Sequence, residues 1–147
     1  MQPQTTGNEN TNAGASGEEG DGEFNTWLAL QRSTDKKRAD ILADIVGHPK
    51  GMPTIEELDY MNPDLSDDSI RRHCKTLMEV GVVEVVELPK GERVRDFPYQ
   101  FYQLTDDARE LFDKNNLFPE DGWKRQYDAV KKTPRITEVE TMPRPES

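Results

Sequence analysis

Residues 66–104 show the clearest pattern of apolar and polar positions in the chain. Apolar side chains recur there at the spacing of one helical face: Ile70, Cys74, Leu77 and Met78. A spacing of i, i+4, i+7 and i+8 predicts a helix over 67–80 with one buried stripe. Ser66 suits the N-cap because its hydroxyl can accept from free amides of the first turn, and Gly81 suits the left-handed residue that ends a helix.

The pattern then changes from helical spacing to alternation. Residues 82–88 are mostly β-branched and alternate in polarity, residues 89–92 (Pro-Lys-Gly-Glu) have turn composition, and residues 99–104 alternate again. Two alternating runs around a turn predict an antiparallel hairpin over 82–104.

Two helices are predicted before this stretch. A helix over about 34–46, capped by Ser33 or Thr34, has an apolar face made of Ala39, Leu42, Ile45 and Val46. A second helix over 55–61 opens with the Thr-x-x-Glu capping box of Thr54 and Glu57, and Pro63 ends it. Because few residues separate it from the helix at 67–80, the two predict a helix-turn-helix pair.

The remaining segments complete the predicted organisation. Thr105 caps a helix over 106–115, and residues 116–133 hold a C-terminal helix marked by apolar positions at i, i+4 and i+7. Three prolines predict that residues 134–147 form an extended tail, and residues 1–23 are too polar to fold, so they read as a disordered acidic tail. The fold class is therefore mainly α with a small antiparallel β-hairpin (α+β), a winged helix-turn-helix domain over 24–115.

Charge is the main difficulty for a nucleic-acid binder. The chain has 147 residues and a formal net charge of −10. The acidic residues are spread unevenly, and residues 66–104 carry six basic and seven acidic side chains, so this segment is close to neutral. An acidic surface suits a salt-rich cytosol, where carboxylates keep a protein hydrated, and we take this halophilic character as a hypothesis.

The sequence contains few residues that could form a catalytic or metal-binding site. His48 lies beside a proline in a predicted loop, and His73 lies on the predicted 67–80 helix. Cys74 falls in the apolar stripe, which favours a small buried side chain over a redox or metal-sensing thiol. We found no phosphate-binding glycine loop and no metal-ligand cluster, so the sequence predicts no enzyme, no metal and no cofactor. The lack of an apolar run of about 20 residues and of a secretory signal predicts a cytoplasmic protein without a membrane partner.

The basic residues favour double-stranded DNA as the partner. In a helix-turn-helix the second helix enters the major groove, and the exposed candidates for DNA binding there are Ser69, Arg71, Arg72, Lys75 and Thr76. Lys90, Arg93 and Arg95 lie in the 89–98 wing and could contact the phosphate backbone. The alternative is that these cations only balance neighbouring carboxylates on a solvated surface. Their joint placement on helix and wing favours the DNA reading.

Two apolar patches flank the predicted domain. The first lies around Trp27 and Leu30, and the second is formed by Trp123, Tyr127 and Val130. Packing inside the domain is one reading of such patches. A dimer interface made from both patches is the other, and it predicts a homodimer.

Several runs resemble haloarchaeal winged helix-turn-helix proteins grouped with ArsR-like transcriptional regulators. The resemblance rests on the 65–73 run, on Leu-x-x-x-Gly-Val-Val at 77–83 and on Tyr-x-Leu-Thr-x-x-Ala at 102–108. It implies a DNA-binding transcription factor, often a homodimer. Metal-sensing ArsR proteins carry a Cys-x-Cys pair that this chain lacks, so their metal site does not transfer. Winged helices also serve as protein-protein interaction modules, and a ligand-sensing regulator is a third reading.

The halophilic hypothesis predicts that folding depends on salt. Carboxylate repulsion across an acidic surface should weaken as ionic strength rises. We expect the midpoint of thermal unfolding, followed by circular dichroism, to rise between low salt and about 1 M KCl. A cooperative transition that is unchanged between these two conditions would exclude the hypothesis.

Overall fold

The computed structural model describes residues 23–145, so almost all of the predicted N-terminal tail lies outside the described residues. The helices and strands are α1 (Thr26–Ser33), α2 (Lys36–Gly47), α3 (Ile55–Met61), α4 (Asp67–Glu79), β1 (Val83–Glu87), β2 (Gln100–Leu104), α5 (Asp106–Lys114), α6 (Glu120–Ala129) and α7 (Pro134–Thr141), with a 3-10 turn η1 (Lys90–Glu92). A mainly helical chain with a two-stranded antiparallel hairpin is the fold class that the sequence predicts.

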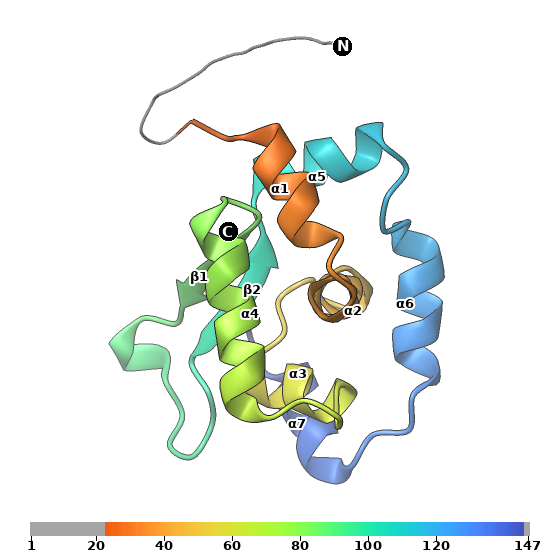
Figure 1. The fold of residues 1–147 in the computed structure, drawn as a ribbon. Coiled ribbons are helices and arrows are strands. Elements are labelled where there is room, and N and C mark those ends of the chain that lie inside the picture. Colours follow the sequence, from red (N-terminus) through yellow and green to blue (C-terminus); the bar gives the residue numbers. More distant parts are fainter. Residues whose placement is uncertain (1–22, 146–147) are drawn as a thin grey trace, which may run out of the picture.

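The main core lies where α1, α2, α3 and α4 meet the hairpin and α5 (Figure 1). Ile41, Leu42, Leu58, Ile70 and Leu77 are fully buried there, each from an apolar face of its helix. Burial of each such side chain stabilises the fold by about 1.5–3 kcal/mol. Their packing holds α2, α3 and α4 against one another.

The hairpin continues directly from α4. Gly81 has a φ of 75°, a left-handed conformation that ends the helix and favours glycine. Val83 pairs with Leu104, and the register runs on to Glu87 opposite Gln100. The loop between β1 and β2, whose residues 89–98 we call the wing, extends from the free end of the hairpin beside α4 (Figure 1).

The structure differs from the predictions at the N-terminal side of the domain. Residues 26–33 form a separate helix, α1, whose N-cap Asn25 accepts from the amide of Leu28. The cap of α2 is Asp35, and not Ser33 or Thr34, since Ser33 is the buried last residue of α1. Met78, predicted to lie on the buried stripe of α4, is 40% exposed, while Ile70, Cys74 and Leu77 are buried.

The prediction of an extended tail over 134–147 is wrong. Pro134 opens α7 instead of preventing it, since a proline fits the first helical position, and Thr133 caps the helix by accepting from the amide of Ile136. Ile136 and Val139 are buried one turn apart. Val139 and Met142 pack on a second apolar cluster with Phe101 and Leu88, at the base of the wing.

A buried polar network joins this C-terminal segment to the centre of the domain. Arg144 donates to Glu57 Oε1 at 2.8 Å and to the carbonyls of Met52, Val139 and Met142. Its guanidinium also lies over the Phe101 ring at 4.7 Å. The side chain of Arg144 is therefore paired on almost every side, as a buried cation requires.

Glu57 takes part in both the capping box and this network. Its Oε1 accepts from the Thr54 amide, and its Oε2 lies 2.6 Å from His48 Nε2. The Lys50 amide donates to His48 Nδ1, which places the ring proton on Nε2, so His48 donates to Glu57. Burial alone would raise the pKa of Glu57, but the hydrogen bond from His48 and the charge of Arg144 outweigh it and hold the pKa below its ordinary value.

Replacing Arg144 should leave the Glu57 carboxylate buried without its cation. We expect Arg144→Ala to lower the free energy of unfolding by about 3 kcal/mol, measured by chemical denaturation near neutral pH. The matched control is Arg125→Ala on the exposed side of α6, which should change it by no more than about 0.5 kcal/mol. Because the pKa of Glu57 is lowered on folding, the difference should be present above about pH 4.5 and should shrink as the pH falls and Glu57 is protonated. Equal stability of the two variants would contradict this account.

Candidate nucleic-acid interface

The turn between α3 and α4 is fixed by side-chain hydrogen bonds. Asn62 donates from Nδ2 to the Leu58 carbonyl and to Asp44 Oδ2 of α2, both at 2.8 Å. Burial raises the pKa of Asp44 to about 7, although the bond from Asn62 opposes the shift. Ser66 then caps α4 by accepting from the Ser69 amide. These bonds set the angle at which α4 leaves the turn.

The outer face of α4 carries the predicted DNA-binding side chains, and several have partners within the helix. Arg71 Nε lies 3.2 Å from Asp67 Oδ2, and Arg72 Nη2 donates to Ser69 Oγ at 3.0 Å. Ser69 therefore orients Arg72, while Lys75 is exposed and makes no ion pair within the described residues. Thr76 is half-buried beside the core and offers only part of its surface.

His73 and Cys74 lie on the inner side of α4. Burial, followed by the charge of Arg38, lowers the pKa of His73, whose Nδ1 lies 3.4 Å from Arg38 Nη1. Cys74 is buried, and burial raises the pKa of its thiol to about 12, which agrees with its reading as a small core side chain. Neither residue belongs to the outer face.

The three basic residues of the wing differ in their surroundings. Arg93 donates from Nε to the Leu88 carbonyl at 2.9 Å, lies near Glu87 and stacks over the Tyr99 ring at 3.8 Å. It therefore stabilises the wing from inside. Lys90 and Arg95 are exposed and have no ion pair within the part of the chain that the structure describes.

A groove of about 460 Å³ separates the wing from α3 and the first turn of α4. Arg135 of α7 borders it and connects its two sides. Its guanidinium forms two hydrogen bonds with Glu56 of α3, donates to the Asp96 carbonyl of the wing at 2.8 Å and lies over the Phe97 ring at 4.4 Å. Sequence reasoning missed this residue because it lies in the segment predicted as an extended tail. The signal that could have found it is Thr-Pro at 133–134, which begins a helix.

The arrangement of three helices, a turn-linked pair and a hairpin with a wing is also found in a solved structure. It is described as a protein with a GntR superfamily winged-helix-turn-helix domain from Halomicrobium mukohataei, is 28% identical, covers 88% of this chain and 94% of that chain, and has a TM-score of 0.73. The chain has a winged helix-turn-helix fold. No protein-family model matches the sequence, and no curated protein matches it.

This comparison refines the resemblance drawn from sequence. It supports the winged helix-turn-helix fold, and the likeness is to a protein from Halomicrobium mukohataei described under the GntR superfamily, not to the ArsR-like regulators specifically. The winged helix-turn-helix fold is typical of DNA-binding regulators that are not enzymes. Within the described residues, no group of His, Cys, Asp and Glu could hold a metal ion, and no helix is long and apolar enough to cross a membrane.

The residues predicted to form a dimer interface do not lie on one surface. Tyr127 is only 3% exposed and packs edge-on against His48 at 5.5 Å, so it belongs to the interior of the winged domain. Leu30 and Trp123 are half-buried. Trp27 is 71% exposed on α1, and Val130 is the exposed C-cap residue of α6. The C-terminal end of α6 lies well apart from α1 (Figure 1). Of the five, only Trp27 and Val130 offer large free apolar surfaces.

The position of Arg135 predicts that α7 restrains the wing. We expect Arg135→Ala to speed amide hydrogen exchange of residues 94–99 severalfold without changing exchange in the α2 core, because the wing loses its bonds to α3. Arg125→Ala is the control, since Arg125 is exposed on α6. Unchanged exchange in 94–99 would show that the wing is held without Arg135.

Proposed function

We propose that this chain is a sequence-specific DNA-binding transcriptional regulator. In this proposal the exposed face of α4 enters the major groove, and the wing residues 89–98 contact the phosphate backbone. The winged helix-turn-helix fold supports the proposal, because such domains use the second helix of the pair for base contacts.

The observation that carries the proposal is the placement of the unpaired cations. Lys75 on α4 and Lys90 and Arg95 on the wing are exposed and make no ion pair among the described residues. The wing extends beside α4, so these side chains belong to two neighbouring elements of the fold (Figure 1). Three exposed cations on two neighbouring elements are suited to contacts with phosphates of one duplex.

Arg72 is the residue proposed to read a base. The bond from Arg72 Nη2 to Ser69 Oγ holds the guanidinium over the first half of α4, and it leaves further N–H groups free. An arginine that pairs bidentately with guanine contributes about 1–3 kcal/mol of discrimination. Arg71, in contrast, forms an ion pair with Asp67, which it must give up to contact a phosphate. The loss of this ion pair reduces the net contribution of Arg71 to the free energy of DNA binding.

One observation favours a second function, a winged helix that binds a protein. Asp67 and Asp68 flank the cations at the start of α4, and Glu92 and Asp96 flank those of the wing. Carboxylates at a DNA surface repel phosphates, whereas a mixed surface of both signs suits a complementary protein surface. DNA binding remains the first proposal, since in the winged helix-turn-helix fold the second helix of the pair contacts bases.

A homodimer is proposed with the DNA-binding function, because regulators of this kind bind two half-sites across a two-fold axis. The support is the free indole of Trp27, which a partner could cover. Analytical ultracentrifugation in molar KCl would test it. We expect the wild type to sediment as a dimer and Trp27→Ala to sediment as a monomer. A wild-type protein that stays monomeric at micromolar concentration would contradict the dimer.

DNA binding is tested by enrichment of genomic fragments on the purified protein in about 1 M KCl, where the Debye length of about 3 Å removes loose electrostatic binding. We expect a few fragments to be enriched by the wild type. Arg72→Ala should weaken binding to those fragments by about tenfold or more relative to others, because it loses base contacts.

Two comparisons separate reading from simple attraction. Arg95→Ala should weaken binding to all fragments by a similar factor, because a phosphate contact carries no sequence information. Arg125→Ala, on an exposed face away from the groove, should bind like the wild type. A folded wild type that enriches no fragment would refute DNA binding and favour the protein-binding function.

A further inference from the structure

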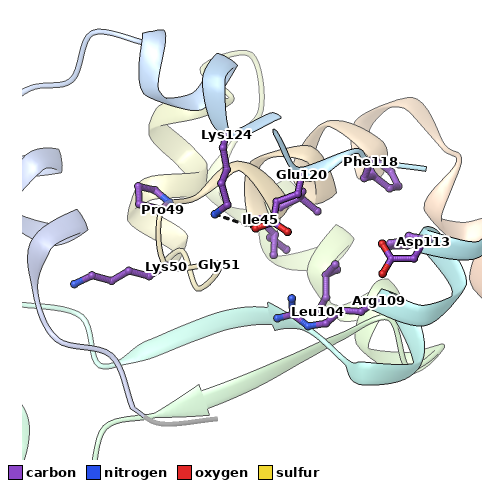
Figure 2. A pocket seen from close by; sticks show the side chains of 12 residues that line it. Ile45, Pro49, Lys50, Gly51, Leu104, Arg109, Asp113, Phe118, Glu120 and Lys124 are labelled. Carbon is purple, nitrogen blue, oxygen red and sulfur yellow. Dashed lines mark ion pairs between the residues drawn. The ribbon is translucent and has the colours of Figure 1, made fainter. Parts of the chain in front are cut away.

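A second cavity lies on the other side of the domain from the α4 surface. It has a volume of about 310 Å³ and opens between α2, the 49–51 loop, the end of β2, α5 and the start of α6 (Figure 2). Its apolar walls come from Ile45, Val46, Leu104, Phe112 and Phe118. This size is at the lower end of cavities that enclose small organic molecules.

Charged side chains approach this cavity from two sides. Lys124 of α6 and Arg109 of α5 extend toward it from opposite walls (Figure 2). Lys124 Nζ donates to the His48 carbonyl at 3.0 Å and lies 3.6 Å from Glu120, so its ammonium is held in place with one donor to spare. The exposed side chain of Arg109 makes no hydrogen bond or ion pair with the described residues.

The formal charge of the residues that line the cavity is positive, whereas that of the whole chain is negative. Three lining residues are basic and two are acidic, in a protein with a net charge of −10. Lys50 Nζ is occupied by the carbonyls of Thr141 and Met142, and Glu120 is paired with Lys124. Of the basic lining residues, only Arg109 has a side chain without a hydrogen bond or ion pair among the described residues. Asp113 is the one acidic lining residue that is likewise unpaired among the described residues.

The wall formed by the α5–α6 loop has an unusual backbone. Phe118 has a φ of 52° and Asn116 a φ of 54°, both in the left-handed region. For a bulky side chain such as Phe118 this conformation is costly, and costly conformations gather at ligand-binding walls. The ring of Phe118 is held against Phe112 at 4.9 Å, so the strained residue supplies a rigid aromatic wall to the cavity.

From these features we infer that the cavity is a binding site for a small amphipathic carboxylate, an organic acid with a compact aromatic or aliphatic body. The body would lie on Ile45, Phe112 and Phe118, and the carboxylate would pair with Arg109, whose planar fork suits two oxygens. A neutral ligand would leave the guanidinium unused, and a polyanion would meet Glu120 and Asp113.

Occupancy of this site would act on the helix-turn-helix through α2. Val46 and Ile45 of α2 form its floor, and the next residue, Gly47, lies so close to α6 that an added Cβ would stand 2.6 Å from the Trp123 carbonyl. The two helices are therefore in backbone contact beside the cavity. A ligand between α5 and α6 would contact α2, which also packs against α3 and α4.

The test uses 3-phenylpropionate as the probe and the full chain without DNA, so its result is independent of the proposed function. Isothermal titration in about 1 M KCl should show saturable one-to-one binding to the wild type. The neutral isostere 3-phenylpropanamide should bind about tenfold more weakly, because it cannot form the charge-assisted pair.

Two variants and a control locate the site. Arg109→Gln should weaken the carboxylate about tenfold and leave the amide unchanged, and Val46→Phe should abolish binding of both by filling the cavity. Arg125→Gln makes the same chemical change at an exposed position outside the cavity and should bind like the wild type. Because Arg109 is exposed, Arg109→Gln should fold like the wild type. It therefore tests the site even if Val46→Phe does not fold. Absence of saturable binding to the folded wild type, or equal affinity of Arg109→Gln for the carboxylate, would overturn the inference.

Discussion

The buried ion pair between Arg144 and Glu57 is the interaction on which the arrangement of this domain depends. Both side chains are almost fully enclosed, so each must be paired to offset the loss of its hydration. The pair joins the C-terminal end of the described chain to the first turn of α3, next to the apolar cluster by which Val139 and Met142 pack against the base of the wing. One interaction thus fixes the C-terminal segment, the capping box and the helix-turn-helix together.

This constraint explains why the two ends of the groove have fixed positions. The C-terminal segment supplies Val139 and Met142 to the apolar cluster under the wing, and one turn earlier Arg135 bonds to α3 and to the wing loop. In a winged domain the separation of wing and recognition helix decides which phosphates each can contact. A tail packed in this way sets that separation before any partner binds, which reduces the ordering cost of binding.

Local signals account for what the sequence could predict. The bounds of α3 and the starts of α4 and α5 follow from capping residues and apolar spacing, and these depend on neighbours within one turn. Long-range pairing accounts for what it could not. The contact of Tyr127 with His48, the ion pair of Glu57 with Arg144 and the docking of α7 each join residues distant in sequence. The prolines of the C-terminal segment predicted an extended chain, although Pro134 begins a helix. Of the candidate site, the residue types were predictable, but the engagement of Arg93 inside the wing was not.

The central claim, that α4 and the wing form a nucleic-acid surface, is tested most directly by mapping the protein's contacts with DNA. Amide chemical-shift changes should be recorded on a ¹⁵N-labelled protein titrated with an enriched duplex in about 1 M KCl, where loose electrostatic contacts are screened. The account predicts that the largest changes fall in residues 67–76 and 90–96, with little change in α5 and α6. Changes confined to α1 or α6, or no saturable change in any region, would contradict it.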